Sequence, residues 1–155
     1  MNETLVWIEK AALENLRDRS NNGDLIHKEA NTLLTILLSG AGAALYFGIQ
    51  HNDVRFSALT VSLWLFVIAT VLTLKCLMFG DYPSVWNEPK NLNKKGYELD
   101  QLRKFELENI QARISLATAL NYTKSRRLNK CILATCSTPL VAFIAWLVSA
   151  YPFFA

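Results

Sequence analysis

Three long apolar runs dominate the pattern of hydrophobic and polar positions along the chain: residues 33–49, 56–78 and 131–154. The first and third runs contain no charged residue, and the second contains only Lys75, whose ammonium group lies close enough to the end of the run to reach lipid headgroups. A hydrocarbon core about 30 Å thick is crossed by roughly 20 apolar residues in a helix, which fits each run. None of the runs has the polar face of a helix in a soluble bundle. We therefore predict an all-α membrane protein with three transmembrane helices.

The stretch before the first run is patterned as an amphipathic helix over residues 3–19, with apolar residues on one face and charges opposite. The sequence Ser-Asn-Asn-Gly-Asp at residues 20–24 predicts a turn, and Asp24 is a suitable N-cap for a second helix that continues into the first run. These two helices would form a helical hairpin at the membrane face.

Between the second and third runs, Pro83, Pro89 and several asparagines predict a loop over residues 81–96. From about Tyr97, apolar residues recur at spacings of three and four, which predicts a long helical stalk without Gly or Pro that continues into the third run. A single helix cannot cover its own apolar stripe, so we expect the N-terminal hairpin or other subunits to pack against it. The segments are thus residues 1–31, 32–79, 80–130 and 131–155.

Lysine and arginine are distributed unevenly. The N-terminal segment 1–31 and the segment 80–130 carry all of them except Arg55 and Lys75, and none follows Lys130. The positive-inside rule therefore places the N-terminus and the central segment in the cytoplasm and the C-terminus on the opposite side of the membrane. An odd number of spans requires the same arrangement.

Motifs of catalytic sites are missing from the sequence. It has no nucleophile elbow, no phosphate-binding glycine loop and no pair of zinc ligands, and its two histidines, His27 and His51, are predicted on opposite sides of the membrane. We expect neither an enzyme nor a metal site, and no cofactor.

Small and hydroxyl-bearing residues cluster in the first apolar run. Thr32, Thr35, Ser39 and Gly42 follow one another at three- and four-residue steps, and Gly40 lies beside them. Small residues let helices approach closely in lipid, and hydroxyl groups are suited to lining a pore. Two interpretations follow: this stripe faces a pore axis, or it packs against other helices of the same subunit.

The third run is interrupted by polar residues and a proline, at Thr135, Ser137, Thr138 and Pro139. Proline lacks the backbone donor that a helix needs, and neighbouring hydroxyl groups can bond to the carbonyls it leaves unpaired. We expect a bend at Pro139, which is either a gating hinge or a fixed kink.

A basic run precedes the third span, formed by Lys124, Arg126, Arg127 and Lys130. One interpretation is an anchor at the cytoplasmic membrane surface. The other is a phosphate-binding ring, made when the arginines of several subunits converge on one axis. In that case, loop residues would add stacking and charge toward a nucleotide: Trp86, Lys94, Lys95 and Tyr97.

The order of these elements resembles a known family. HKEANTLLTILLSG leads into the first span, and ELENIQARISLATALNYTKSRRLNKC leads into the third after a second span and a proline-containing loop. From Asp24 to the C-terminus this order is similar to small transmembrane effectors of bacterial antiphage systems, namely the Pycsar-type transmembrane effector domain and the related Hailong-type channels. The chain departs from that pattern at His27 and Glu29, where the family has an acidic residue and then a lysine.

The resemblance implies a homo-oligomer, favoured as a tetramer, in the inner membrane with a periplasmic C-terminus. It implies a pore or channel regulated by a nucleotide or oligonucleotide from a partner nucleotidyltransferase or cyclase, and growth arrest through depolarisation. Two alternatives from the residues remain open: a non-conducting membrane-anchored adaptor for a cytoplasmic partner, and a phage-encoded lysis or exclusion protein.

Overall fold

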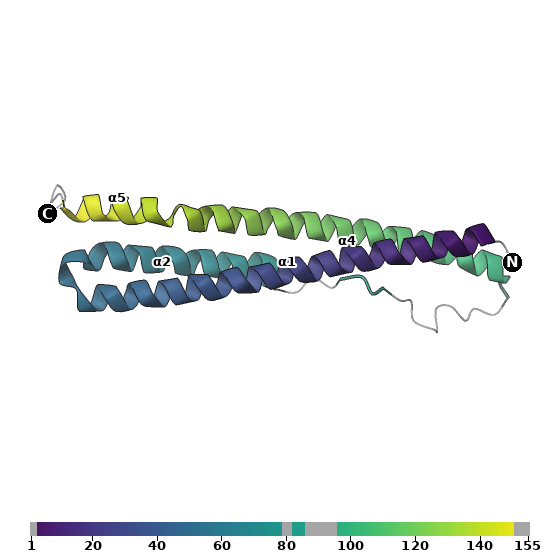
Figure 1. Cartoon of the computed structure of the whole chain (residues 1–155), viewed down its shortest axis with the longest axis horizontal. Helices are drawn as coiled ribbons and strands as arrows, with labels where there is room; N and C mark the ends of the chain where they lie inside the picture. The colour runs from purple at the N-terminus through teal and green to yellow at the C-terminus, as the bar shows by residue number, and fades with distance from the viewer. Residues whose placement is uncertain (1–2, 79–81, 86–95, 151–155) are drawn as a thin grey trace. The chain divides into compact units, whose positions relative to one another are not determined.

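A computed structural model describes residues 3–78, 82–85 and 96–150, and the regular structure in this part of the chain is entirely helical (Figure 1). Three helical stretches are long and apolar enough to cross a membrane. This confirms the all-α class and the three candidate spans, and it is compatible with a membrane location. The elements in chain order are α1 (Glu3–Gln50), η1 (Asn52–Val54), α2 (Arg55–Leu72), η2 (Thr73–Leu77), α4 (Leu99–Cys136) and α5 (Thr138–Ala150).

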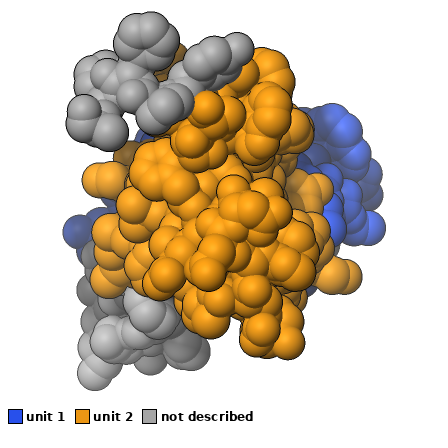
Figure 2. All heavy atoms as spheres, turned by 90° about the vertical axis from the view of Figure 1, so that its left-hand side faces the viewer, with its two compact units in different colours: residues 1–26, 79–123 blue, residues 27–78, 124–155 orange. Residues whose placement is uncertain are grey.

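The chain divides into two compact units, coloured separately in Figure 2. Unit 1 comprises Met1–Ile26 and Phe79–Thr123, and unit 2 comprises His27–Met78 and Lys124–Ala155. Because α1 and α4 are each continuous, both helices contribute residues to both units.

In unit 1, the first part of α1 packs against the first part of α4. Leu16, Ile110 and Ile114 form a buried apolar cluster. An ion pair joins Glu9 to Arg103, with 3.5 Å between Oε1 and Nε. The N-terminal part of α1 thus covers the apolar stripe of the stalk at Ile110 and Ile114, so in this region the stripe is buried within one subunit.

The predicted turn at residues 20–24 is wrong, because α1 passes through them as helix. Asparagine and glycine disfavour helix only weakly compared with proline, so long-range contacts can decide the conformation. Here the Asn121 side-chain amide donates to the Arg19 carbonyl at 2.7 Å. A Cβ atom at Gly23 would lie 2.6 Å from the Tyr82 ring, so the ring can pack against the helix only because residue 23 has no side chain. The N-terminal segment is therefore one helix and no hairpin.

Unit 2 begins with an antiparallel hairpin of α1 and α2, joined through His51 and η1 at the predicted connection. Helices α1 and α2 approach each other closely at this corner because residue 48 is glycine: a Cβ atom there would lie 3.0 Å from the Cβ of Ala58. Further along, the Ser62 hydroxyl donates to the Ala41 carbonyl at 2.9 Å. On its other side α2 packs against α5. Small residues thus allow the close helix contacts that drive association in lipid.

The second span ends in a π-helix, η2, which the sequence pattern does not reveal. The Met78 amide donates to the Thr73 carbonyl at 2.8 Å, five residues back. A π-turn breaks the regular bonding of an α-helix, and such turns recur at functional sites. In η2 the Lys75 carbonyl accepts a hydrogen bond from the Arg127 guanidinium at 3.0 Å. This irregular turn therefore fixes α4 against the end of the second span.

Candidate functional site

The hydroxyl stripe of α1 lies away from the interior of unit 2. Thr32, Thr35, Ser39 and Gly42 are all exposed, and a Cβ atom added at Gly42 would meet no atom within 4 Å. The buried side of this part of α1 is formed by Ala30, Leu37, Ala41 and Gly48. At about 100° per residue, Thr32, Thr35 and Ser39 fall on the opposite side of the helix from these buried positions, whereas Gly42 lies nearer to α2 and lines a groove with Leu59 and Ser62. The three hydroxyl residues are therefore not used to pack the helices of one subunit.

Gly40 behaves differently from its neighbours in the stripe. It is half-buried, and a Cβ atom there would approach the Leu65 side chain of α2 to 3.2 Å. Within the stripe, the hydroxyl groups of Thr32 and Thr35 donate to the carbonyls of Lys28 and Asn31 at 3.0 and 3.1 Å. The two interpretations of the small-residue cluster thus apply to different residues. Gly40 packs within the subunit and Gly42 lines a groove with α2, whereas Thr32, Thr35 and Ser39 face away from the other helices of the subunit.

The four residues of the basic run lie on different sides of α4 and differ in exposure. Arg126, Arg127 and Lys130 are exposed, whereas Lys124 is half-buried. The Lys124 carbonyl accepts a contact from the Cys76 thiol at 3.9 Å. The Arg126 guanidinium is exposed and forms no ion pair with any residue in the described ranges, so it is available to a ligand.

A groove between α2 and α4 brings a further cation, Lys75, beside the basic run, which the sequence did not predict. Lys75 lines the groove together with Arg127 and Lys130, and the rest of its lining is apolar, from Trp64 and Val71 on one side to Ala134 on the other. The groove has a volume of about 270 Å³. Its geometry depends on the antiparallel register of α2 and α4, which residue order alone does not give.

The predicted interruption of the third span is confirmed, and it lies at Ser137, two residues before Pro139. Helix α4 ends at Cys136 and α5 begins at Thr138. The hydroxyl groups of Thr135 and Ser137 donate to the carbonyls of Cys131 and Ala134 at 2.8 and 2.7 Å, and not to the Thr135 carbonyl, which Pro139 leaves without an amide donor. The Thr138 Oγ1 atom is buried and has no hydrogen-bond partner among the described residues.

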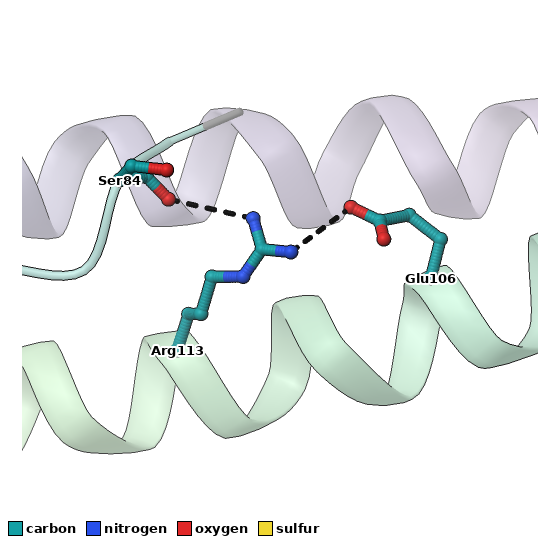
Figure 3. Close-up of polar contacts among 3 residues, drawn as sticks. All are labelled: Ser84, Glu106 and Arg113. Atoms are coloured by element: carbon teal, nitrogen blue, oxygen red, sulfur yellow. Dashed lines mark hydrogen bonds and ion pairs between the residues drawn. The ribbon is translucent and has the colours of Figure 1, made fainter. Parts of the chain in front are cut away.

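The segment 82–85 of unit 1 is held on α4 by polar contacts that the sequence did not predict. Figure 3 shows the Arg113 guanidinium donating to the Ser84 carbonyl at 3.4 Å and pairing with the Glu106 carboxylate at 3.2 Å. The Tyr82 hydroxyl donates to the Asn121 side-chain oxygen at 2.6 Å. Burial, and then the nearby Asp24 carboxylate, raise the pKa of Tyr82 above its ordinary value. Tyr82 therefore stays protonated and can donate.

Three predicted ligand residues, Trp86, Lys94 and Lys95, lie outside the described residues. Within the ranges that are described, no group of three His, Cys, Asp or Glu side chains is arranged to hold a metal ion.

Comparison with known proteins gives no relative: no family model, no curated protein and no solved structure matches the chain.

Proposed function

We propose that the chain is a subunit of a homo-oligomeric channel or pore in the bacterial inner membrane, with unit 1 in the cytoplasm and the C-terminus in the periplasm. A nucleotide or oligonucleotide made by a partner nucleotidyltransferase or cyclase regulates conduction, and a tetramer is the favoured assembly. Conduction depolarises the membrane and arrests the growth of an infected cell. The order of elements, which resembles small antiphage effectors, supports the defence role.

The exposed stripe of α1 is the observation that supports conduction best. Other outward positions of the same helix carry large apolar side chains, such as Ile36, Leu38 and Leu45, which suit lipid. By contrast, Thr32, Ser39 and Gly42 present hydroxyl groups and bare backbone. Such residues favour contact with another helix or with water rather than with acyl chains. One subunit cannot enclose a water-filled path with a single stripe, so the proposal requires several copies around an axis.

The regulatory ligand is assigned to the basic run at the start of the third span. Arg126 is its most suitable member because it is exposed and makes no ion pair with a described residue. A guanidinium group binds phosphate through paired N–H donors. Around the axis of an oligomer, one Arg126 from each subunit would concentrate positive potential and attract a polyanionic nucleotide.

Ion flux from liposomes that contain the purified full-length chain tests this proposal. Cyclic mononucleotides and short oligonucleotides are the ligands to add. Ser39→Trp should reduce the flux strongly, because bulk would enter the water path. Leu133→Trp is the matched control, since Leu133 is 72% exposed on the apolar surface of α4 and its replacement should leave the flux unchanged. An oligomer that passes no ions in any ligand condition would exclude the channel.

A membrane-anchored adaptor is the second candidate, and the surface of unit 1 favours it specifically. Trp7, Leu99 and Tyr122 are exposed there, at 70%, 65% and 68%. Tryptophan and tyrosine are enriched in protein interfaces. An adaptor predicts a stable complex with a cytoplasmic protein, no flux, and sensitivity of that complex to Trp7→Ala.

A further inference from the structure

The groove between α2 and α4 has two chemically different ends. At one end three cationic side chains gather: Lys75 from η2, and Arg127 and Lys130 from α4. No acidic side chain lines the groove, and none of these three cations forms an ion pair with a described residue. The remaining lining is apolar. The groove is therefore complementary to a molecule with an anionic head and a hydrocarbon tail.

Hydrogen bonds between the two helices hold the groove at both ends. At the cationic end the Arg127 guanidinium donates to the Lys75 carbonyl at 3.0 Å. At the apolar end the Trp64 indole donates to the Ala134 carbonyl at 3.3 Å. A guanidinium has five N–H donors, so Arg127 keeps donors for a ligand after making this bond. The groove is thus preformed, and the Arg127 guanidinium is already oriented at its cationic end.

The length of the groove matches one leaflet of a bilayer. Lys75 and Trp64 mark its two ends along the second span. At a rise of about 1.5 Å per residue they are separated by about 16 Å along the helix. Half of a hydrocarbon core of about 30 Å is roughly 15 Å. With the cations at headgroup level, the tryptophan lies near the middle of the membrane, and an acyl chain fits along the groove between them.

We infer that this groove binds an anionic phospholipid, whose phosphate contacts Lys75, Arg127 and Lys130 while one acyl chain lies along the apolar lining. Cationic pockets between transmembrane helices on the cytoplasmic side bind anionic headgroups in this way. Arg126 does not line the groove and is left for the regulatory ligand. The site requires a membrane location and does not require conduction.

Native mass spectrometry of the full-length chain in a nonionic detergent tests the inference with two probes, phosphatidylglycerol and phosphatidylcholine. Lys75→Gln with Lys130→Gln should weaken phosphatidylglycerol retention about 25-fold, because each lysine beside an anionic headgroup contributes about fivefold. Lys10→Gln with Lys104→Gln is the control pair, because both side chains are exposed in unit 1 and the change of charge is the same. Equal losses in both pairs, or equal retention of both lipids by the unmodified chain, would overturn the inference.

Ala134→Phe separates a lipid from free phosphate, because it fills the apolar end of the groove without changing any charge. A lipid site predicts lower phosphatidylglycerol retention in this variant, with no displacement of lipid by inorganic phosphate. Unchanged retention in Ala134→Phe, or displacement by millimolar phosphate, would show that the cations bind phosphate alone and would contradict the lipid site. Loss of ion flux with intact lipid retention would count against the channel only.

Discussion

Replacement of Gly23 by alanine tests how unit 1 is assembled, because two opposing effects of known size meet at this residue. Gly23 lies inside α1, where glycine destabilises a helix by about 1 kcal/mol relative to alanine. The added Cβ atom would lie 2.6 Å from the Tyr82 ring, so the ring would have to leave. Its hydroxyl would then lose the 2.6 Å hydrogen bond to Asn121.

The magnitudes predict the sign of the change. The lost hydrogen bond contributes about 1 kcal/mol. Exposure of the half-buried Tyr82 ring costs roughly another 1 kcal/mol, about half of what full burial of an aromatic side chain contributes. Against the helix gain of about 1 kcal/mol, Gly23→Ala should therefore destabilise the chain by about 1 kcal/mol. In a Tyr82→Ala background the same change should stabilise it by about 1 kcal/mol, which gives a coupling of about 2 kcal/mol.

Thermal unfolding of the detergent-solubilised chain, followed by circular dichroism, measures all four members of this double-mutant cycle. For a chain of this size, about 1 kcal/mol shifts Tm by roughly 2–4 °C. Gly23→Ala should lower Tm in the parent and raise it in Tyr82→Ala. If Gly23→Ala raises Tm equally in both backgrounds, Tyr82 does not pack on Gly23, and this contact does not stabilise the helix through residues 20–24.

Three further predictions concern separate features. Burial and Asp24 raise the pKa of Tyr82. The contribution of Tyr82 to the free energy of unfolding should therefore be complete below the unfolded pKa of about 10 and should fall as pH rises through the folded pKa. Tyr82→Phe should lack this decrease of the unfolding free energy with pH. Gly48→Ala should lower Tm by crowding α2, whereas Gly42→Ala, in open space, should not. Arg126→Ala should abolish the nucleotide response of ion flux but leave membrane insertion intact; a lost insertion would instead support a simple anchor.

Much of the fold could be predicted because apolar length and charge are local properties of the sequence. The corner between Gln50 and Arg55 and the interruption before Pro139 lie close to their predicted positions for that reason. The predicted turn at residues 20–24 is wrong, and the contacts that Asn121 and Tyr82 make with this part of the helix come from residues distant in sequence. The π-helix η2 was also missed, since no pattern of residue types marks it.

The candidate site was predictable in composition and not in arrangement. The basic run and the hydroxyl stripe are visible as residue types at helical spacing. How closely Gly40 and Gly42 approach α2 depends on how α1 rotates against it: Gly40 packs on Leu65, whereas Gly42 lines an open groove. Lys75 joins Arg127 only through the register of two antiparallel helices. Sequence spacing describes one helix at a time, so contacts between helices required the structure.

The reversal potential of single channels with a charge at position 39 tests the central claim most directly. Ser39 is exposed on the stripe that we assign to the pore. If Ser39 faces the pore, Ser39→Asp should shift selectivity toward cations and Ser39→Lys toward anions, because a ring of like charges sets the sign of the permeant ion. The two variants should therefore move the reversal potential in opposite directions. If both variants conduct with the unmodified reversal potential, the stripe does not line the conducting path.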